Sequence, residues 1–440
     1  MTDATASPNA LPAPTRRLND AALLKKRYAA ERRFQMYGIA AILFALVFLI
    51  VLFSSIIGQG WSAFVQTGYN LDVAIEKEVV APEGKTDPDS LRLGDYTKLA
   101  RNSLAKALGY EYAKMSRPDR RDLNNLLSRG VDVQIRDRVL ADPSLIGKSV
   151  RLSILAAGNV DALLKGSISR KTPEANRQLN DKQVKWVDTL VEKGIARKEF
   201  NSGLFTYGAS SQPETSGLAV ALVGSLFMML IVAFLAVPLG AAAAAYLEEF
   251  APKNRWTDMI EVNINNLAAV PSIVFGLLGL AIFINMFGIP RSASLVGGLV
   301  LTLMTLPTII IATRAAIRAV PPSIREAALG VGASKMQTLF HHTLPLALPG
   351  IMTGTIIGLV QALGETAPLL MIGLVAFVVD VPATPLDPAT ALPVQIYMWA
   401  TSAERGFVER TAGATIVLLV FLFFMNAAAV WLRRKFERKW

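Results

Sequence analysis

The chain has 440 residues, of which 52% are hydrophobic and 18% are charged, with a net charge of +11 and no cysteine. Soluble domains usually have about a quarter of their residues charged, so this composition excludes an ordinary soluble protein. With no cysteine and only two histidines, the chain offers no transition-metal ligand set and no Cys–His catalytic pair, and we expect no metal, cofactor or catalytic residue. Nucleic-acid binding would need a basic soluble face with stacking aromatic residues, which the sequence lacks.

Long apolar runs indicate a membrane protein. A hydrocarbon core about 30 Å thick is crossed by roughly 20 apolar residues in a helix. Six runs reach that length, near residues 37–58, 217–247, 262–287, 293–313, 348–378 and 411–432. The first run follows a polar tail, residues 1–36, and both its length and this lead exceed those of a cleavable signal peptide. We therefore expect an uncleaved span at 37–58.

Residues 59–216 lie between the first two spans and are too polar to cross a membrane. We expect a small soluble domain there, mostly helical with some strand, including a helix over 97–109. Gly147-Lys148-Ser149 is similar to the end of a nucleotide-binding loop. Such a loop has a glycine five residues earlier, where this chain has Asp142. Nucleotide binding is therefore not expected.

The later spans contain residues that bend helices or pack them closely. Four prolines are expected to bend or break spans: Pro238, Pro271, Pro307 and Pro368. Three asparagines are interpreted as a helix-start cluster of the third span: Asn263, Asn265 and Asn266. Gly350, Gly354 and Gly358 share one face of the fifth span, which predicts close packing on a helix of this chain or of a second subunit.

Positive charge is distributed unevenly between the loops. Lysine and arginine gather in LLKKRYAAERRF (23–34), at Arg314, Arg318, Arg325 and Lys335 after the fourth span, and in the C-terminal RRKFERKW (433–440). The opposite short loops carry only Arg291, Arg405 and Arg410. The positive-inside rule then places both termini in the cytoplasm and residues 59–216 outside.

The loop between the fourth and fifth spans contains REAALGVGASKMQTLFHHTLP (325–345). Residues 324–331 are predicted to form a short helix that Gly330 and Gly332 interrupt. Ser334 and Gln337 have the spacing of a capping box that starts a second helix, which Leu344-Pro345 is expected to end. Along this second helix, apolar side chains repeat at helical spacing: Met336, Leu339, Phe340 and Thr343.

Such a helix–turn–helix is suited to docking. Ala327 and Ala328 are small, so another protein surface could approach the first helix closely, as when a helix lies in a groove. The alternative is an ordinary amphipathic loop helix.

This stretch resembles the EAA motif of ABC-importer permeases. The matching residues are Glu326, Ala327, Ala328, Gly332, Leu344 and Pro345, while His342 departs from the usual aliphatic residue. The resemblance implies that the loop 314–347 holds a coupling helix, which sits in a cleft of a separate ATPase subunit. It also implies that ATP hydrolysis takes place on that subunit and that this chain is not an enzyme.

Four further segments resemble PstA-type phosphate permeases, over most of residues 217–440. They are NNLAAVPSIVFGLLGL (265–280), LTLMTLPTIIIATRAAI (301–317), ALGETAPLL (362–370) and ALPVQIYMWA (391–400). The resemblance implies an all-α membrane protein with six transmembrane helices. Its MetI-like permease core would span residues 217–440 and carry an extracytoplasmic, mostly helical insert domain.

The resemblance also implies partners and a location. The chain would lie in the bacterial inner membrane, within the lipid bilayer, as one of two related permease subunits. Its other partners would be an ATPase subunit dimer and a periplasmic phosphate-binding protein, and the substrate would be inorganic phosphate.

Glu365 is expected deep within the fifth span, where a charged side chain usually faces protein or water. It is either a translocation-path residue with a basic partner or a buried residue that locks two helices. Permeases of this type often carry arginine one turn earlier, where this chain has Gln361. Arg314 is then the remaining basic candidate, and its alternative role is a positive-inside anchor. Thr366 completes the set of path candidates.

Two other functions remain open. The EAA element is shared by importers of other solutes, so a permease for another solute is the first alternative. A soluble outer domain would also suit a membrane sensor. Sensors normally continue into a signalling domain after the last span, whereas only about eight residues follow it here.

Overall fold

The computed structural model describes residues 21–81 and 87–436 of the chain. Two compact units, residues 1–56 and 57–440, are described separately. The described part of the first unit is the helix α1 (Ala21–Gly60), whose last residues belong to the second unit. This helix includes the predicted span 37–58 and begins earlier, at Ala21, because the lysine, arginine, glutamate and alanine residues of 21–36 favour helix. Residues 1–20 of the predicted tail lie outside the described part.

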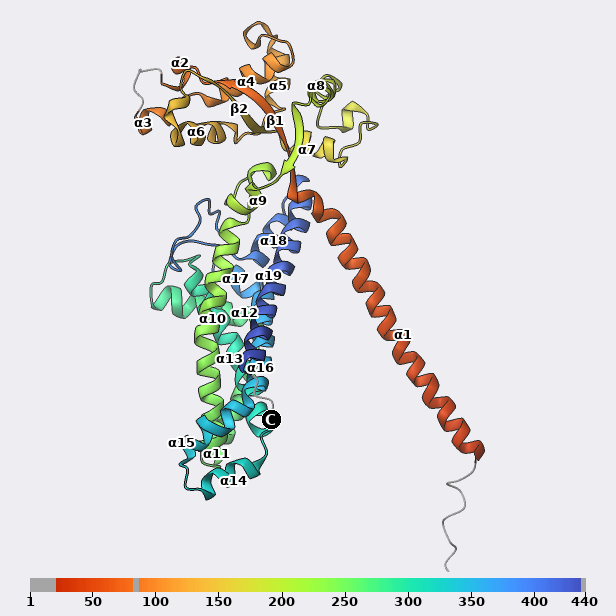
Figure 1. Cartoon of the computed structure of the whole chain (residues 1–440), viewed down its shortest axis with the longest axis vertical. Helices are drawn as coiled ribbons and strands as arrows, with labels where there is room; N and C mark the ends of the chain where they lie inside the picture. The colour runs from red at the N-terminus through yellow and green to blue at the C-terminus, as the bar shows by residue number, and fades with distance from the viewer. Residues whose placement is uncertain (1–20, 82–86, 437–440) are drawn as a thin grey trace, which may run out of the picture. The chain divides into compact units, whose positions relative to one another are not determined.

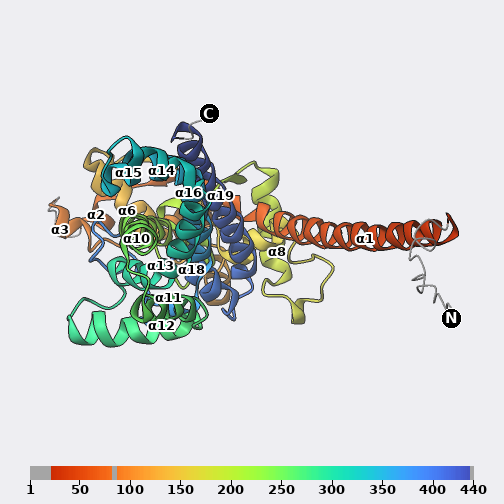
Figure 2. The same ribbon diagram turned by 90° about the horizontal axis from the view of Figure 1, so that it is seen from below.

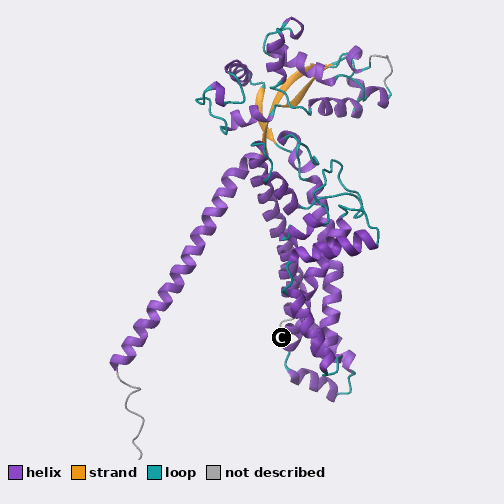
Figure 3. Cartoon of the chain, turned by 180° about the vertical axis from the view of Figure 1, so that it is seen from behind, coloured by secondary structure: helices purple, strands orange, loops and turns teal. Residues whose placement is uncertain are grey.

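Residues 61–216 form a mixed α/β insert domain around a three-stranded antiparallel sheet (Figures 1 and 3). The strands β1 (Val65–Ala74), β2 (Ser149–Leu155) and β3 (Ala196–Phe200) have the order β2-β1-β3. Tyr69 lies opposite Ile154 on one side and Ala196 on the other. The expected all-α class is therefore wrong for this domain, whereas the expectation of some strand is confirmed.

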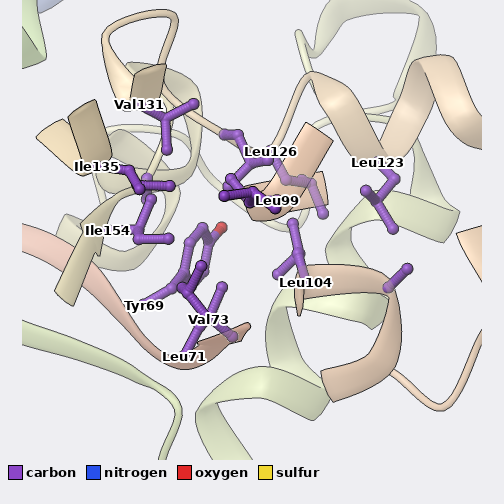
Figure 4. Close-up of a cluster of buried hydrophobic side chains, with 14 of the residues drawn as sticks. Tyr69, Leu71, Val73, Leu99, Leu104, Leu123, Leu126, Val131, Ile135 and Ile154 are labelled. Atoms are coloured by element: carbon purple, nitrogen blue, oxygen red, sulfur yellow. The ribbon is translucent and has the colours of Figure 1, made fainter. Parts of the chain in front are cut away.

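Short helices complete the insert domain. They are α2 (Lys77–Val80), α3 (Pro88–Leu91), α4 (Tyr96–Ala107), α5 (Arg117–Asn124), α6 (Val131–Ala141), α7 (Gly158–Lys165), α8 (Asp181–Glu192) and α9 (Gly203–Thr206). The predicted helix over 97–109 is confirmed as α4. Figure 4 shows the core, in which Tyr69, Leu99 and Ile154 are buried together. Ser149 begins β2 rather than a helix, so Gly147-Lys148-Ser149 also lacks the structural context of a nucleotide loop.

The rest of the second unit is a helix bundle, and the two short helices α14 and α15 lie at one end of it (Figure 1). Its helices are α10 (Ala219–Ala245), α11 (Arg255–Ala268), α12 (Ser272–Gly279), α13 (Ser294–Arg318), α14 (Pro322–Gly330), α15 (Lys335–Thr338), α16 (Leu344–Gly364), α17 (Ala367–Met371), α18 (Leu392–Ala400) and α19 (Gly406–Phe436). Three π-helical segments extend α10, α12 and α15: Tyr246–Phe250, Leu280–Met286 and Leu339–Thr343.

Among the described residues, five helices are long and apolar enough to cross a membrane, or six if a bent pair counts as one span. The bent pair, Arg255–Ala268 with Ser272–Met286, turns by 100° and replaces the continuous third span predicted at 262–287. Pro271 explains the break, since proline has no backbone N–H and disfavours helix at the residue before it. The three asparagines lie late in α11, which Asn254 caps at its start, so their interpretation as a helix-start cluster was wrong.

The bundle helices approach closely where small residues meet. A Cβ built on Gly350 would lie 2.6 Å from Ala316 Cβ, and one on Gly358 would lie 2.7 Å from Thr305 Cγ2. Gly354 likewise faces Ala312. The three glycines of α16 thus lie against α13 of the same chain, and α10 packs on another side of α13 (Figure 2). This packing holds the middle of α16 against α13.

Candidate functional site

The first half of the EAA stretch is the helix α14, which begins with a proline at its first turn and ends at Gly330. Glu326 and Ala327 are exposed, whereas Ala328 is buried against the bundle. Glu326 forms no ion pair or side-chain hydrogen bond with any residue that the structure describes. Its carboxylate is therefore available to a partner.

A tight turn connects α14 to α15. Gly332 has φ +88°, a left-handed conformation that glycine adopts without strain. Ser334 then caps α15: its Oγ accepts a hydrogen bond from the Gln337 N–H at 3.2 Å, and the Ser334 N–H donates to Gln337 Oε1 at 2.9 Å. The predicted capping box is confirmed.

The second helix does not end at Leu344-Pro345, so that prediction was wrong. α15 continues through the π-helical segment Leu339–Thr343 into α16, where the Leu344 N–H donates to the carbonyl of Leu339. This wider turn accommodates Pro345, which has no N–H to contribute at the start of α16. The connecting loop is consequently shorter than the predicted 314–347, because Arg314 belongs to α13 and Leu344 and Pro345 to α16.

The α14–α15 end of the bundle presents apolar side chains to solvent. Val331, Met336 and Phe340 are exposed, while Leu339 and Thr343 are buried. The predicted apolar repeat therefore divides into a face that packs on the bundle and a face that does not. Unpaired Glu326 is exposed on α14, the helix that packs against α15. Such a mixture of apolar anchors and a free charge is typical of a protein-docking surface.

Ion pairs join four helical segments at this end of the bundle: α11, α13, α14 and the π-helical end of α10. Arg314 Nε lies 2.6 Å from Glu248 Oε1, and its Nη2 pairs with Glu261 of α11. Arg318 Nε lies 2.8 Å from Glu248 Oε2. Arg325 of α14 pairs with Glu249 at 2.9 Å and also donates to the carbonyl of Ile317 at 2.7 Å. α14 is thereby tied to the end of α10, and α13 is tied to both α10 and α11.

Sequence reasoning missed the acidic members of this network, Glu248, Glu249 and Glu261. The detectable signal was the YLEEF segment at the end of the second span, where two adjacent carboxylates follow a long uncharged run. Arg314 is buried and pairs with Glu248 and Glu261. It is therefore neither a snorkelling anchor nor a partner of Glu365.

Glu365 lies just beyond the end of α16 in an extended conformation, and it is half-buried. The fifth span was predicted to continue to residue 378, but its helix ends at Gly364, and α17 begins only at Ala367. Arg314 lies near the level of Gly350 and Gly354, about 20 Å of helix rise from Glu365. The structure therefore does not bring these two candidates together. Gln361 is exposed and Thr366 is half-buried near Glu365.

A cavity inside the bundle is too small for a solute. It measures about 10 Å³ and is lined by residues that include Ser225, Met228, Leu301 and Leu369. Such a space holds at most about one water molecule. This space therefore offers no room for a solute.

Comparison with known proteins gives two family matches. Residues 236–440 match the family described as binding-protein-dependent transport system inner membrane component. Residues 21–174 match a domain described as being of unknown function, DUF3333, which covers α1 and much of the insert domain.

Relatives and solved structures are similar over about half of the chain. The probable ABC transporter permease protein YqgI of Bacillus subtilis is 31% identical over 263 residues, covering 57% of this chain and 88% of that protein. The phosphate transport system permease protein PstA 1 of Mycobacterium tuberculosis H37Rv is 33% identical, covering 54% of this chain and 79% of that protein. The inward-facing MetNI methionine ABC transporter has a TM-score of 0.42 at 19% identity, covering 50% of this chain and 98% of that one.

Proposed function

This chain belongs to the family of binding-protein-dependent transport inner membrane permeases, and from that premise we propose that it is the permease of a phosphate importer. Membership makes it a multi-pass membrane subunit of a bacterial ABC importer, in which ATP hydrolysis takes place on a separate ATPase subunit. A binding-protein-dependent importer also has a partner permease and a periplasmic binding protein.

Coupling to the ATPase is assigned to the α14–α15 end. The observation that carries this assignment is that one short helix–turn–helix exposes an unpaired Glu326 and the uncovered Val331, Met336 and Phe340. Ala327 and Gly332 keep the helix–turn–helix compact, while Leu344 and Pro345 lead it into α16 without interruption. Closure of an ATPase dimer on this surface would move α14, and the Arg325–Glu249 pair would transmit that movement to the end of α10.

Orientation follows from the same assignment. An ATPase works in the cytoplasm, so the α14–α15 end faces the cytoplasm together with the C-terminal end of α19. The basic residues 433–435 at that end agree with the positive-inside rule. The insert domain, at the opposite end of the bundle in Figure 1, then lies outside the membrane.

The translocation path is assigned to a surface shared with a second permease. Gln361 is exposed on α16, and polar side chains within a membrane usually face protein or water rather than lipid. Glu365 and Thr366 follow it where the helix stops, so their backbone and side chains can reach a path beside α16. Phosphate as the solute is supported by relatives whose names state phosphate transport.

A solute other than phosphate is the alternative, because the relative YqgI is named only as a probable ABC transporter permease and its name states no solute. The test is uptake by the complex purified with this chain, in proteoliposomes supplied with ATP inside and its binding protein outside. Labelled phosphate should accumulate, and unlabelled phosphate should compete, whereas sulfate and molybdate should not. Competition by sulfate or molybdate alone would overturn the assignment of phosphate. If no ATPase copurified with this chain, the coupling role would be overturned.

A further inference from the structure

Four aromatic rings form a row at the base of the insert domain. Trp61 and Phe64 belong to the 3-10 helix η1 (Trp61–Phe64), Phe205 to α9, and Phe200 to the end of β3. Neighbouring ring centroids along the row are 6.2, 6.1 and 6.3 Å apart. The last two pairs are stacked, with interplanar angles of 25° and 12°. The fold thus brings together rings that are up to about 140 positions apart in the sequence.

Three of the four rings are not part of a core. Trp61 is 69% exposed, Phe200 is 68% exposed and Phe205 is 37% exposed. Phe64 packs on an apolar cluster formed by Leu204, Leu218, Phe407 and other residues, which accounts for that one ring. A contiguous exposed aromatic surface usually marks a site that binds a membrane, another protein or a ligand.

Contacts with α19 define the level of the row along the bundle. A Cβ built on Gly60 would lie 2.7 Å from the backbone of Ala412, and one on Gly413 would lie 2.5 Å from Ala63 Cβ. At this level α19 changes character: Glu409 and Arg410 are its last charged residues before an uncharged run from 411 to 432. A run of about that length spans the hydrocarbon core, so its first turn marks the edge of the membrane.

We propose that the row Trp61–Phe64–Phe205–Phe200 is an interfacial anchor that inserts into the lipid headgroup region and holds the insert domain at a fixed height. Tryptophan concentrates at this depth, because its indole ring is apolar while its N–H can bond to water or headgroups. Phenylalanine adds apolar area of the kind that interfacial segments bury at the boundary between headgroups and acyl chains. The inference depends on the membrane spans and not on the identity of the solute.

A lysine lies where a lipid phosphate would be expected. Lys198 is exposed two residues before Phe200 on the same face of β3, about 7 Å further along the strand. It forms no ion pair within the part of the chain that the structure describes. A cation at that height can reach the phosphate of a phospholipid whose acyl chains contact the rings.

The experiment uses the full chain in nanodiscs and measures tryptophan quenching by phosphatidylcholine brominated either near the carbonyl or near the acyl terminus. The chain has six tryptophans, so the Trp61 signal is obtained as the difference between the natural chain and Trp61→Phe. This difference should be quenched roughly twofold or more by the shallow bromines and less by the deep ones, as expected for a ring at the interface. Trp186→Phe is the matched control, because Trp186 is buried in the insert domain and its difference signal should not respond to either lipid.

A second variant leaves Trp61 in place and changes another ring of the row. Phe200→Ser removes an exposed ring without opening the core, and it should reduce shallow quenching of Trp61 while the melting temperature stays unchanged. Quenching of Trp61 by aqueous acrylamide but by neither lipid would overturn the anchor. Shielding of Trp61 only after a binding protein is added would also overturn it, in favour of a protein-docking surface.

Discussion

Lys165 Nζ lies 2.6 Å from Glu409 Oε1, which joins the insert domain to the first turn of the last span. The same ammonium group lies 2.6 Å from Asp161 Oδ2, and Asp161 Oδ1 in turn accepts hydrogen bonds from the N–H and hydroxyl of Thr67. The side chains of Lys165, Asp161 and Glu409 are only 6%, 12% and 20% exposed. Buried charges of the insert domain are therefore balanced by a charge of the bundle, and the two parts are built as one structure.

Lys165→Met should destabilise the chain by about 3–5 kcal/mol, because it removes the ammonium group that pairs directly with the buried Asp161 and Glu409 carboxylates. The measurement is thermal or denaturant unfolding of the purified chain in detergent. Lys114→Met is the matched control, since its ion pair with Glu111 is 79% and 61% exposed. Loss of such an exposed pair costs less than about 1 kcal/mol. Equal effects of the two variants would contradict a buried link.

Glu214 predicts a pH dependence of stability. Burial raises the pKa of Glu214 above its ordinary value of 4.5, assisted by Glu404 and opposed by the hydrogen bond from the Ser128 hydroxyl and by Arg410. The folded chain therefore holds this proton more tightly than the unfolded chain. The resulting stability is fully present below pH 4.5 and is lost as pH rises through the raised pKa.

Glu214→Gln carries no titrating proton, so its free energy of unfolding should fall less steeply with pH across that window. For a single group the slopes can differ by at most about 1.36 kcal/mol per pH unit. Unfolding followed at several pH values for both chains measures the difference. Parallel curves would show that Glu214 has the same pKa in both states.

The long helices were predictable because their signal is strong and local. Uncharged runs such as 411–432 require a span whatever surrounds them, and Ser334 with Gln337 forms a capping box from its own neighbours. The sheet was harder to predict, although Val150, Leu152 and Ile154 alternate in β2 as a half-buried strand requires. Its central strand, β1, is buried without a break over residues 66–69 and alternates only from Tyr69 to Ala74, so the period-2 signal covers about half of the strand.

The ionic contacts could not have been predicted. Arg314 meets Glu248 and Glu261, which are more than fifty residues away in the sequence, only because α10, α11 and α13 end at the same level. The pairing hypothesis between Arg314 and Glu365 failed for the same reason, since nothing in the sequence reveals the level at which each residue lies. The helix continues from α15 into α16 past Pro345 because of a π-helical turn. A search for the 3.6-residue period of an α-helix does not detect such a turn.

Glu326→Lys should abolish uptake while the chain still inserts and folds. Glu326 is exposed and makes no ion pair in the described parts of the chain, so its reversal costs little internally but opposes a docking partner. We expect uptake to fall at least about tenfold, the effect of roughly 1.4 kcal/mol of lost docking energy. Glu111→Lys, an exposed reversal in the insert domain, should leave uptake unchanged. Normal uptake by Glu326→Lys in proteoliposomes would remove Glu326 from the docking surface.

Arg314→Met should affect both stability and coupling. It leaves Glu248 and Glu261 near the end of the bundle without their shared cation, which we expect to cost about 3–5 kcal/mol. Arg318→Met is the control, because Arg318 contacts the same Glu248 but is largely exposed and should cost less than about 1 kcal/mol. Unfolding of both variants, with ATPase activity measured in the assembled complex, would separate them. A smaller effect for Arg314 than for Arg318 would contradict its central position.

Gly354→Ala tests the contact between α16 and α13. A Cβ at position 354 would collide with Ala312 Cβ, and both helices are fixed by further contacts at Gly350 and Gly358. The helices must separate locally, so we expect a loss of about 1–3 kcal/mol, the usual cost of overpacking. Gly364→Ala is the matched control in the same helix, because a Cβ there meets nothing within 4 Å and alanine favours helix by up to about 1 kcal/mol. Unfolding should therefore show opposite signs for the two variants. If Gly354→Ala were as stable as Gly364→Ala, α16 would be free to move away from α13 at no cost, and the close approach would not be what holds these two spans together.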